Sequence, residues 1–399
     1  MDNNKAIRVI CQCLKVLDIS GFRSTFDDHR TRKFFTGTAI ELHVISQLLQ
    51  LASYDVIPIQ LRAHPELQKA IGLESISASQ LSRKTESICT GSLESLFYHL
   101  ISQIDRKTGH KTGITPSIGR LHLIDATDIS LPSLLGCWAR CGSKKTAVRL
   151  HVRLVVADPD TVFPNKVIAS TSNVQENKVV QELTLDDDVT YVMDRGYEKC
   201  EHFEKWVSDG IRFVVRVRDR LTLYPVEGTG REVPKSPGNH QILRDVDVLS
   251  NKTTMPLRLV EFVDEHERRY RILTSRWDLT ATEVALIYKN RWKIEIFFKW
   301  VKQHLNLVRI HGKAPHAVWN QLFMSLIAFA LSLLVKLELQ TDKSQWEILK
   351  TMRIYLFHPW EQFLQELFKP PTKVSKGRQK VEGKSGRKYE PQKGIKRWN

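Results

Sequence analysis

Residues 189–219 read VTYVMDRGYEKCEHFEKWVSDGIRFVVRVRD, and this stretch decides the fold class. A short apolar strand runs up to Asp194 and is followed by Gly196, which suits a turn. The polar segment after it fits a helix that ends at the glycine of WVSDG, and the apolar run IRFVVRVRD is the next strand. Strand, helix and strand in this order favour parallel pairing, so we predict an α/β or mixed sheet.

Patterns on both sides extend this central unit. Residues 120–132, RLHLIDATDISLP, and residues 146–157, TAVRLHVRLVVA, have the apolar character of two earlier strands. Residues 1–115 mostly follow helical periodicity, and helical patterns return at residue 279. Residues 218–278 interrupt the alternation of strands and helices with runs that are typical of hairpins. We therefore predict a β-rich insertion there.

The composition indicates a polyanionic partner. The 399-residue chain has 60 basic and 44 acidic side chains, a net charge of +16. This balance favours nucleic acid. A membrane surface is the competing polyanion, but no basic amphipathic anchor or lipidation signal opens the chain. The longest apolar run, residues 322–335, is too short to span a bilayer, so we expect a buried core helix.

The six cysteines are irregularly spaced and do not form a disulfide framework, so we expect a reducing cytoplasm. Cys137 and Cys141, with His122 and His151 in the same region, allow a zinc site. The alternative is that the cysteines are small buried residues.

Two aspartates directly follow apolar strands, Asp125 in LIDAT and Asp194 in VMDRG. A lone aspartate at such a place is usually a turn residue. Two of them in the sheet of a strongly basic protein indicate a cation site, because Mg²⁺ prefers oxygen ligands and two ions assist phosphodiester displacement. Asp128 is a competing candidate, but Asp125 fits the predicted strand end better.

Residues 288–305, YKNRWKIEIFFKWVKQHL, predict a helix with a third carboxylate, Glu295. At 100° per residue, this acid shares a sector of about 60° with Tyr288, Arg291 and Lys302, at the border of the apolar face. A merely solvated face is the alternative reading, and it suits Lys289 and Lys293. The cation-flanked glutamate instead predicts the edge of a site, where Arg291 and Lys302 bind phosphates and Tyr288 donates to one.

The spacing Tyr-x2-Arg-x3-Glu-x6-Lys in this segment resembles the signature of the insertion-sequence-four (IS-four) group of bacterial DDE transposases. IDATDI and VMDRGY are similar to the two aspartate motifs of that family, and the resemblance covers roughly residues 70–310. It implies an RNase H-like fold that uses two Mg²⁺ ions, for which Mn²⁺ can substitute. The implied catalytic and metal-binding triad is Asp125, Asp194 and Glu295. The implied contacts to the transposon end are Tyr288, Arg291 and Lys302.

The same resemblance implies a cut-and-paste transposase acting on DNA. Such an enzyme nicks the element at its 3′ end, passes through a hairpin and joins the freed 3′-OH to target DNA. A homodimer on DNA, in the bacterial cytoplasm at the nucleoid, is expected. The family's base-stacking tryptophan has no motif that places it here; Trp277 is a candidate by aromatic character only, and we expect a core position for it. The competing functions are a metal-dependent nuclease without strand transfer and a catalytically silent DNA-binding regulator.

Five regions follow from these patterns. They are a helical domain for DNA binding and end recognition (1–115), the first part of the RNase H-like core (116–217), the β-rich insertion (218–278), the second part of the core with C-terminal helices (279–368) and a basic tail (369–399).

Overall fold

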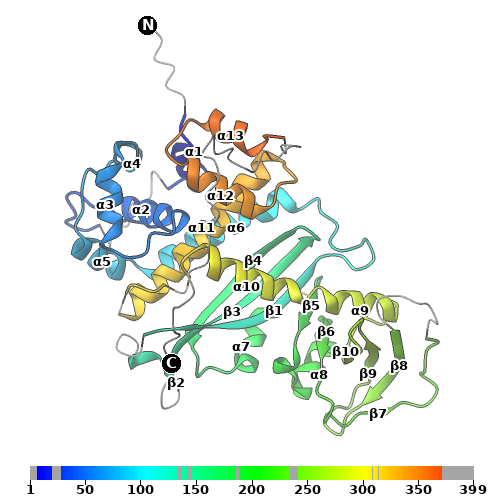
Figure 1. Ribbon diagram of the computed structural model, residues 1–399. Helices are drawn as coiled ribbons and strands as arrows, with labels where there is room; N and C mark the ends of the chain where they lie inside the picture. Colours follow the sequence, from blue (N-terminus) through cyan, green and yellow to red (C-terminus); the bar gives the residue numbers. More distant parts are fainter. Residues whose placement is uncertain are drawn as a thin grey trace, which may run out of the picture.

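A computed structural model describes most of the chain (Figure 1). The described residues are 7–19, 28–132, 137–141, 145–185, 188–233, 241–307, 309–312 and 314–370. A ten-stranded mixed sheet runs through this part of the molecule, in the order β2-β3-β1-β5-β6-β10-β9-β8-β7, with β4 paired to β3. The strands are β1 (Leu121–Ser130), β2 (Arg140–Cys141), β3 (Lys145–Asp158), β4 (Thr161–Thr171), β5 (Thr190–Met193), β6 (Arg212–Arg216), β7 (Tyr224–Pro225), β8 (Gln241–Leu249), β9 (Leu257–Val263) and β10 (Arg269–Thr274).

The predicted parallel pairing is confirmed at the centre of the sheet. β5 pairs in parallel with β1 on one side and with β6 on the other. The connecting helix α8 (Cys200–Ser208) ends where Gly210 adopts φ +72°, a left-handed conformation that favours glycine. All four residues of β5 are buried, as expected of a short strand covered on both faces.

The position of Asp125 differs from the prediction. We expected it at the end of a strand, but β1 continues for five residues beyond it, as far as Ser130. The reason is the long antiparallel partner β3, which stays paired with β1 from Leu121 to Ser130. The parallel pairing with β5 stops opposite Ile124, so Asp125 is the first residue of β1 without a partner on that side.

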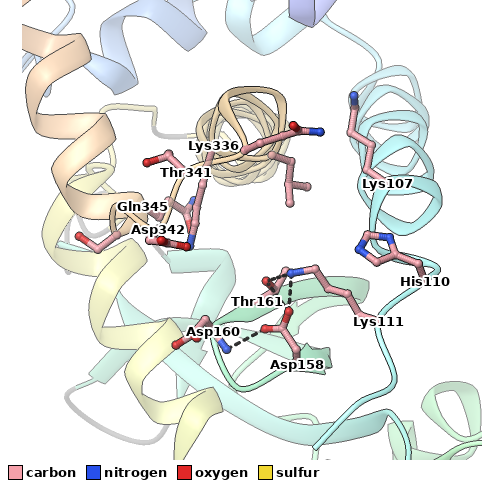
Figure 2. Close-up of a pocket in the computed structure, with 13 residues that line it drawn as sticks. Lys107, His110, Lys111, Asp158, Asp160, Thr161, Lys336, Thr341, Asp342 and Gln345 are labelled. Carbon is pink, nitrogen blue, oxygen red and sulfur yellow. Dashed lines mark hydrogen bonds and ion pairs between the residues drawn. The ribbon is translucent and has the colours of Figure 1, made fainter. Parts of the chain in front are cut away.

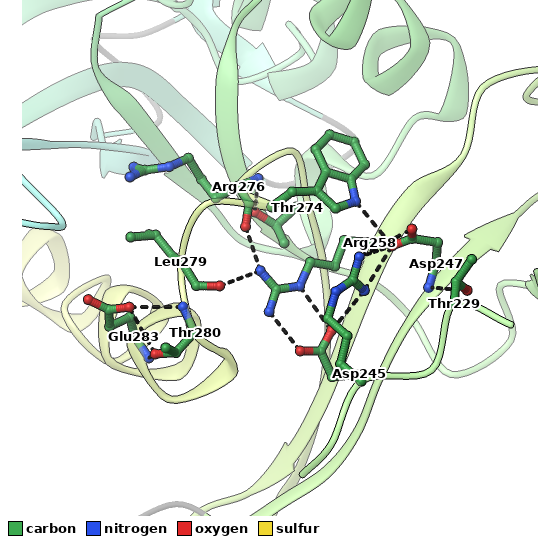
Figure 3. A network of polar contacts seen from close by, with 11 residues as sticks. Thr229, Asp245, Asp247, Arg258, Thr274, Arg276, Leu279, Thr280 and Glu283 are labelled. Carbon is green, nitrogen blue, oxygen red and sulfur yellow. Dashed lines mark hydrogen bonds and ion pairs between the residues drawn. The ribbon is translucent and has the colours of Figure 1, made fainter. Parts of the chain in front are cut away.

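The expected hairpins between β6 and α9 (Ala281–Lys289) are present, and they extend the main sheet because β10 pairs with β6. A buried ion pair joins them to α9 (Figure 3). Arg258 is 1% exposed and binds Asp245 through two hydrogen bonds of 2.9 and 2.7 Å. The same guanidinium donates to the carbonyls of Arg276 and Leu279. This network therefore fixes where α9 begins, at the capping box of Thr280.

Helices cover both faces of the sheet. α7 (Glu176–Leu183) and α8 lie on one face, and α10 (Trp292–His304) crosses the other (Figure 1). The long helix α11 (Pro315–Leu339) packs against the N-terminal helices and contains the apolar run at 322–335. By length and composition α11 is able to cross a membrane, but 78% of its most apolar stretch is buried inside the fold. The predicted buried core helix is thus confirmed.

Helices also make up the two ends of the described chain. The N-terminal helices are α1 (Val9–Leu17), α2 (Thr36–Leu48), α3 (Val56–Ala63), α4 (Pro65–Ile71), α5 (Ala78–Ser87) and α6 (Thr90–Thr108). They meet the C-terminal helices α12 (Gln345–Tyr355) and α13 (Trp360–Leu367), because the backbone around Arg8 pairs with that around Pro359. The predicted basic tail lies outside the described residues, which end at Pro370.

The segment at 288–305 is not one helix, and the single-helix prediction is wrong. α9 ends at Lys289 and α10 begins at Trp292. Around the junction, the Arg291 amide donates to the Tyr288 carbonyl, and the Ile294 amide donates to the Arg291 carbonyl. Both bonds span three residues, as in a 3₁₀ turn, and not the four of an α-helix. A projection at a constant 100° per residue therefore does not hold across this junction.

Candidate active site

An arginine joins the strand and the helix that carry two of the predicted acids. Arg291 stands just before α10, and its Nη2 donates to Glu295 Oε1 at 2.5 Å. Its Nη1 lies 3.6 Å from Asp125 Oδ2 on β1. The Arg291 and Asp125 side chains are 15% and 19% exposed. Two acids far apart in sequence therefore share one half-buried guanidinium.

Asp194 enters the site from the neighbouring strand. It directly follows β5, and its Oδ1 accepts a hydrogen bond of 2.7 Å from the Gly196 amide at the start of a short 3₁₀ turn, η2 (Arg195–Tyr197). Burial raises the pKa of Asp125 to about 7, the nearby charges of Asp194 and Glu176 raise it too, and Arg291 opposes the shift. Asp125 thus connects the other two predicted acids, because Arg291 links it to Glu295 and the charge of Asp194 acts on it.

The three predicted DNA-contact residues take different positions. The Lys302 Nζ donates to Thr127 Oγ1 at 2.6 Å and to the Asp128 carbonyl at 3.0 Å, and burial lowers its pKa. Tyr288 is only 6% exposed, and the guanidinium of Arg291 lies 5.8 Å from the centre of its ring. Arg291 and Lys302 therefore lie partly exposed near Glu295, whereas Tyr288 is buried next to Arg291. A shallow pocket between β1 and α10 is lined by Asp125, Ala126, Thr127, Glu295, Phe298, Lys299, Lys302 and Gln303.

Asp128, the competing candidate, is part of an ion pair instead. Its carboxylate accepts hydrogen bonds from Arg149 Nε at 2.8 Å and Arg149 Nη2 at 3.3 Å. Ser172 Oγ donates to the same carboxylate at 3.1 Å. These bonds hold β1, β3 and the end of β4 together, so the structure favours Asp125 as the acid that faces Arg291 and Glu295.

Sequence reasoning missed two residues next to Asp194. Glu176 is the first residue of α7, and Tyr197 ends the η2 turn. The charges of Asp125, Glu176 and Asp194 add to the effect of burial and raise the pKa of Tyr197 well above its usual value. Glu176 lies in a polar stretch without a motif, but the DRGY sequence was a signal that could have drawn attention to Tyr197.

The donor set fits a hard divalent cation in its chemistry. Asp125, Asp194, Glu176 and Glu295 supply carboxylate oxygens, which Mg²⁺ prefers, and Mg²⁺ needs few of them because it keeps several waters. Within the described ranges, no three histidine, cysteine, aspartate or glutamate side chains are already grouped closely enough to surround an ion. Cys141, His122 and His151 are therefore not grouped as a zinc site in the described part of the chain. The Cys137 side chain lies outside the described residues.

A cavity of about 920 Å³ lies elsewhere, between the ends of α6 and α11 and the β3–β4 turn (Figure 2). Lys111 forms an ion pair with Asp158 and donates to Thr161 Oγ1 at 2.8 Å. Asp158 also accepts from the backbone amide of Asp160 at 2.7 Å. Because Lys111 and Asp158 neutralise each other's charge in this ion pair, we consider this cavity a weaker candidate for the active site than the pocket beside β1.

Comparison with known proteins assigns the class. Residues 117–331 match the transposase DDE domain family, so this chain belongs to that family. The match contains β1, β5 and α10, the elements that carry the three predicted acids.

Individual relatives agree with this assignment. The chain is 28% identical over 261 residues to a probable transposase for insertion sequence element IS5377 from Geobacillus stearothermophilus, covering 65% of this chain and 67% of the relative. It is 31% identical over 242 residues to the putative transposase y4zB of Sinorhizobium fredii, covering 58% and 64%. A putative transposase for insertion sequence element IS4SA from Synechocystis is 20% identical over 286 residues, covering 71% and 79%.

Proposed function

We propose that this transposase is an insertion-sequence enzyme of the IS-four group that cleaves element ends and joins them to target DNA. The observation that carries the proposal is the shared contact of Asp125 and Glu295 with Arg291, beside Asp194. The sheet order β3-β1-β5-β6, with one antiparallel and two parallel pairings, supports an RNase H-like core.

Asp125, Asp194 and Glu295 would hold two Mg²⁺ ions, or Mn²⁺ in their place. When bound, these ions would activate the attacking oxygen and stabilise the leaving one. Asp125 would give up its proton on loading, because burial raises its pKa to about 7 without a cation. Arg291 would move off the acids toward a DNA phosphate, and Tyr288 would support its guanidinium from below. Hydrolysis would come first, then hairpin formation and strand transfer.

Lys302 would hold the DNA backbone at the pocket between β1 and α10. Its ammonium is anchored to Thr127 and the Asp128 carbonyl, so its position is set before DNA arrives. Pre-positioning lowers the entropy cost of binding a phosphate. This supports a role for Lys302 in placing the scissile strand next to Glu295.

Trp277 supports a further contact with the element end. It is 38% exposed, so the expected core position is wrong. Its indole Nε1 donates to Asp247 Oδ1 at 3.0 Å, which fixes the ring while leaving part of it open. An exposed, fixed aromatic ring suits stacking with an unpaired base.

The N-terminal helices would recognise the terminal inverted repeats. α5 begins with a capping box at Ser77 and exposes Arg83, whereas Lys84 pairs with Asp28 at 2.8 Å. Both element ends must be held together, so the protein would act as a homodimer on DNA, at the nucleoid in the bacterial cytoplasm. The net charge of +16 supports DNA as the partner.

Incubation of the protein with an inverted-repeat end and Mg²⁺ tests this function. We expect nicked, hairpin and joined products, and we expect Glu295→Gln to remove all three while retaining DNA binding. Asp160→Asn, an exposed acid outside the site, is the control and should leave the products unchanged. Nicking without joining would favour the nuclease, and binding without any product would favour the silent regulator.

A further inference from the structure

Glu176 extends the group of acids on the side of Asp194. α7 begins with this residue and packs against β1, β3 and the η2 turn (Figure 1). The amino end of a helix favours a carboxylate there, and the N-cap Gln175 makes no side-chain capping bond. Glu176 is therefore a fixed acid on a regular element, aimed at the DRGY turn that carries Asp194.

A glycine keeps the Glu176 and Asp194 carboxylates close together. A Cβ at Gly196 would lie 2.5 Å from Glu176 Oε2 and 2.9 Å from Asp194 Oδ1. Both oxygens therefore lie beside Gly196, and a larger residue at 196 would force the Glu176 carboxylate to shift. Two carboxylates in such proximity repel each other unless a proton or a cation lies between them.

Arg149, the cation next to Glu176, is paired mainly with Asp128. Arg149 Nη1 lies 3.7 Å from Glu176 Oε1, too far for a hydrogen bond. The same guanidinium makes its short bonds to Asp128, at 2.8 and 3.3 Å. Arg149 therefore compensates Asp128 more fully than Glu176, whose pKa is raised by burial and by Asp194.

Tyr197 supplies an independent sign that this space receives an oxygen ligand. The side chain is 0% exposed, and among the described residues its hydroxyl has no hydrogen-bond partner. It lies near Asp125, Glu176 and Asp194, whose charges affect its pKa. A buried O–H without an acceptor is destabilising by itself, so it indicates an acceptor that arrives with a ligand.

We propose that Glu176 is a fourth carboxylate ligand of the divalent-cation site, on the Asp194 side, and that Tyr197 is its positioning residue. The Tyr197 hydroxyl donates to an oxygen of that coordination shell and holds it against Asp194. Gly196 leaves room for both carboxylates, because a Cβ there would displace the end of the Glu176 side chain. This inference rests on the proposed metal-dependent function and adds two residues to the predicted triad.

Binding of Mn²⁺ to the full-length protein, followed by the EPR signal of the free ion, tests the proposal. We expect Glu176→Gln to weaken Mn²⁺ binding roughly 10- to 100-fold and Tyr197→Phe roughly 10-fold. Glu182→Gln, an exposed acid on the same helix, is the matched control and should bind like the wild type.

Thermal unfolding without metal separates a ligand role from a structural one. A ligand role predicts that both variants unfold at the same or a higher temperature than the wild type, since each loses repulsion or an unpaired donor. If Glu176 only supports Arg149, Glu176→Gln lowers the unfolding temperature and leaves Mn²⁺ affinity unchanged, which overturns the proposal.

The inference and the proposed function fail in different ways. A wild-type protein that binds Mn²⁺ and cleaves element ends, with Glu176→Gln and Tyr197→Phe equal to it, refutes the inference alone. A wild-type protein that neither binds Mn²⁺ nor cleaves refutes the proposed function and the inference with it. If Glu176→Gln does not fold, Tyr197→Phe still decides the question, because it keeps the packed ring.

Discussion

The raised pKa of Asp125 predicts an unusual pH dependence of stability. Burial moves this pKa from 3.8 to about 7, a shift of about three units. At 1.36 kcal/mol per unit, ionised Asp125 destabilises the metal-free fold by about 4 kcal/mol. The native state holds this proton more tightly than the unfolded state, so the penalty is absent below pH 4. It develops as the pH rises from about 4 to 7.

Urea unfolding in EDTA between pH 5 and 8 measures this effect. We expect Asp125→Asn to lose the part of the pH dependence that comes from this group, and to be more stable than the wild type at pH 8. The matched control is Asp128→Asn, three residues along the same strand, which removes the ion pair and one of the two acceptors for Arg149 and should destabilise the protein. Added Mg²⁺ should stabilise the wild type at pH 8 more than Asp125→Asn. Identical pH profiles for wild type and Asp125→Asn would refute the reasoning.

Three further changes test other parts of the molecule. Lys302→Ala should weaken DNA binding and reduce the slope of log affinity against log salt by about 1, and an unaltered slope would argue against a phosphate contact. Trp277→Ala should abolish the change in 2-aminopurine fluorescence when a labelled element end binds, whereas Trp277→Phe should retain part of it; equal signals from both would contradict stacking. Arg258→Ala removes the two short bonds to buried Asp245, which keeps only a 3.3 Å bond from Arg231, and should cost about 3 kcal/mol in urea unfolding. A loss of under about 1 kcal/mol would show that the network is not needed to hold α9.

Local sequence patterns predicted the individual elements well. The β5–α8–β6 unit followed from two apolar runs and the glycine of WVSDG, and the start of α9 followed from the helical pattern that returns at residue 279. Such signals succeed because they depend on residues a few positions apart. The run at 322–335 predicted a buried helix for the same reason.

Features that depend on partners elsewhere in the chain were predicted less well. Local patterns misplace the end of β1 because its length is set by β3. Periodicity predicts one continuous helix at 288–305 because it does not reveal the tightened turn at Arg291. The exposure of Trp277 depends on its bond to Asp247 across the hairpins. The hairpins were expected as an insertion, yet they continue the main sheet through β10.

The sequence by itself determined the parallel strands at the centre, and it predicts that three acids, Asp125, Asp194 and Glu295, belong together. Those assignments rest on residue type, short spacing and motif order, which are all present in the chain before it folds. Only the tertiary structure decided which residues lie next to these acids: Arg291 contacts both Asp125 and Glu295, and Glu176 lies with Asp194 beside Gly196. Burial and charge at a site depend on which distant elements pack there, and no local pattern encodes that.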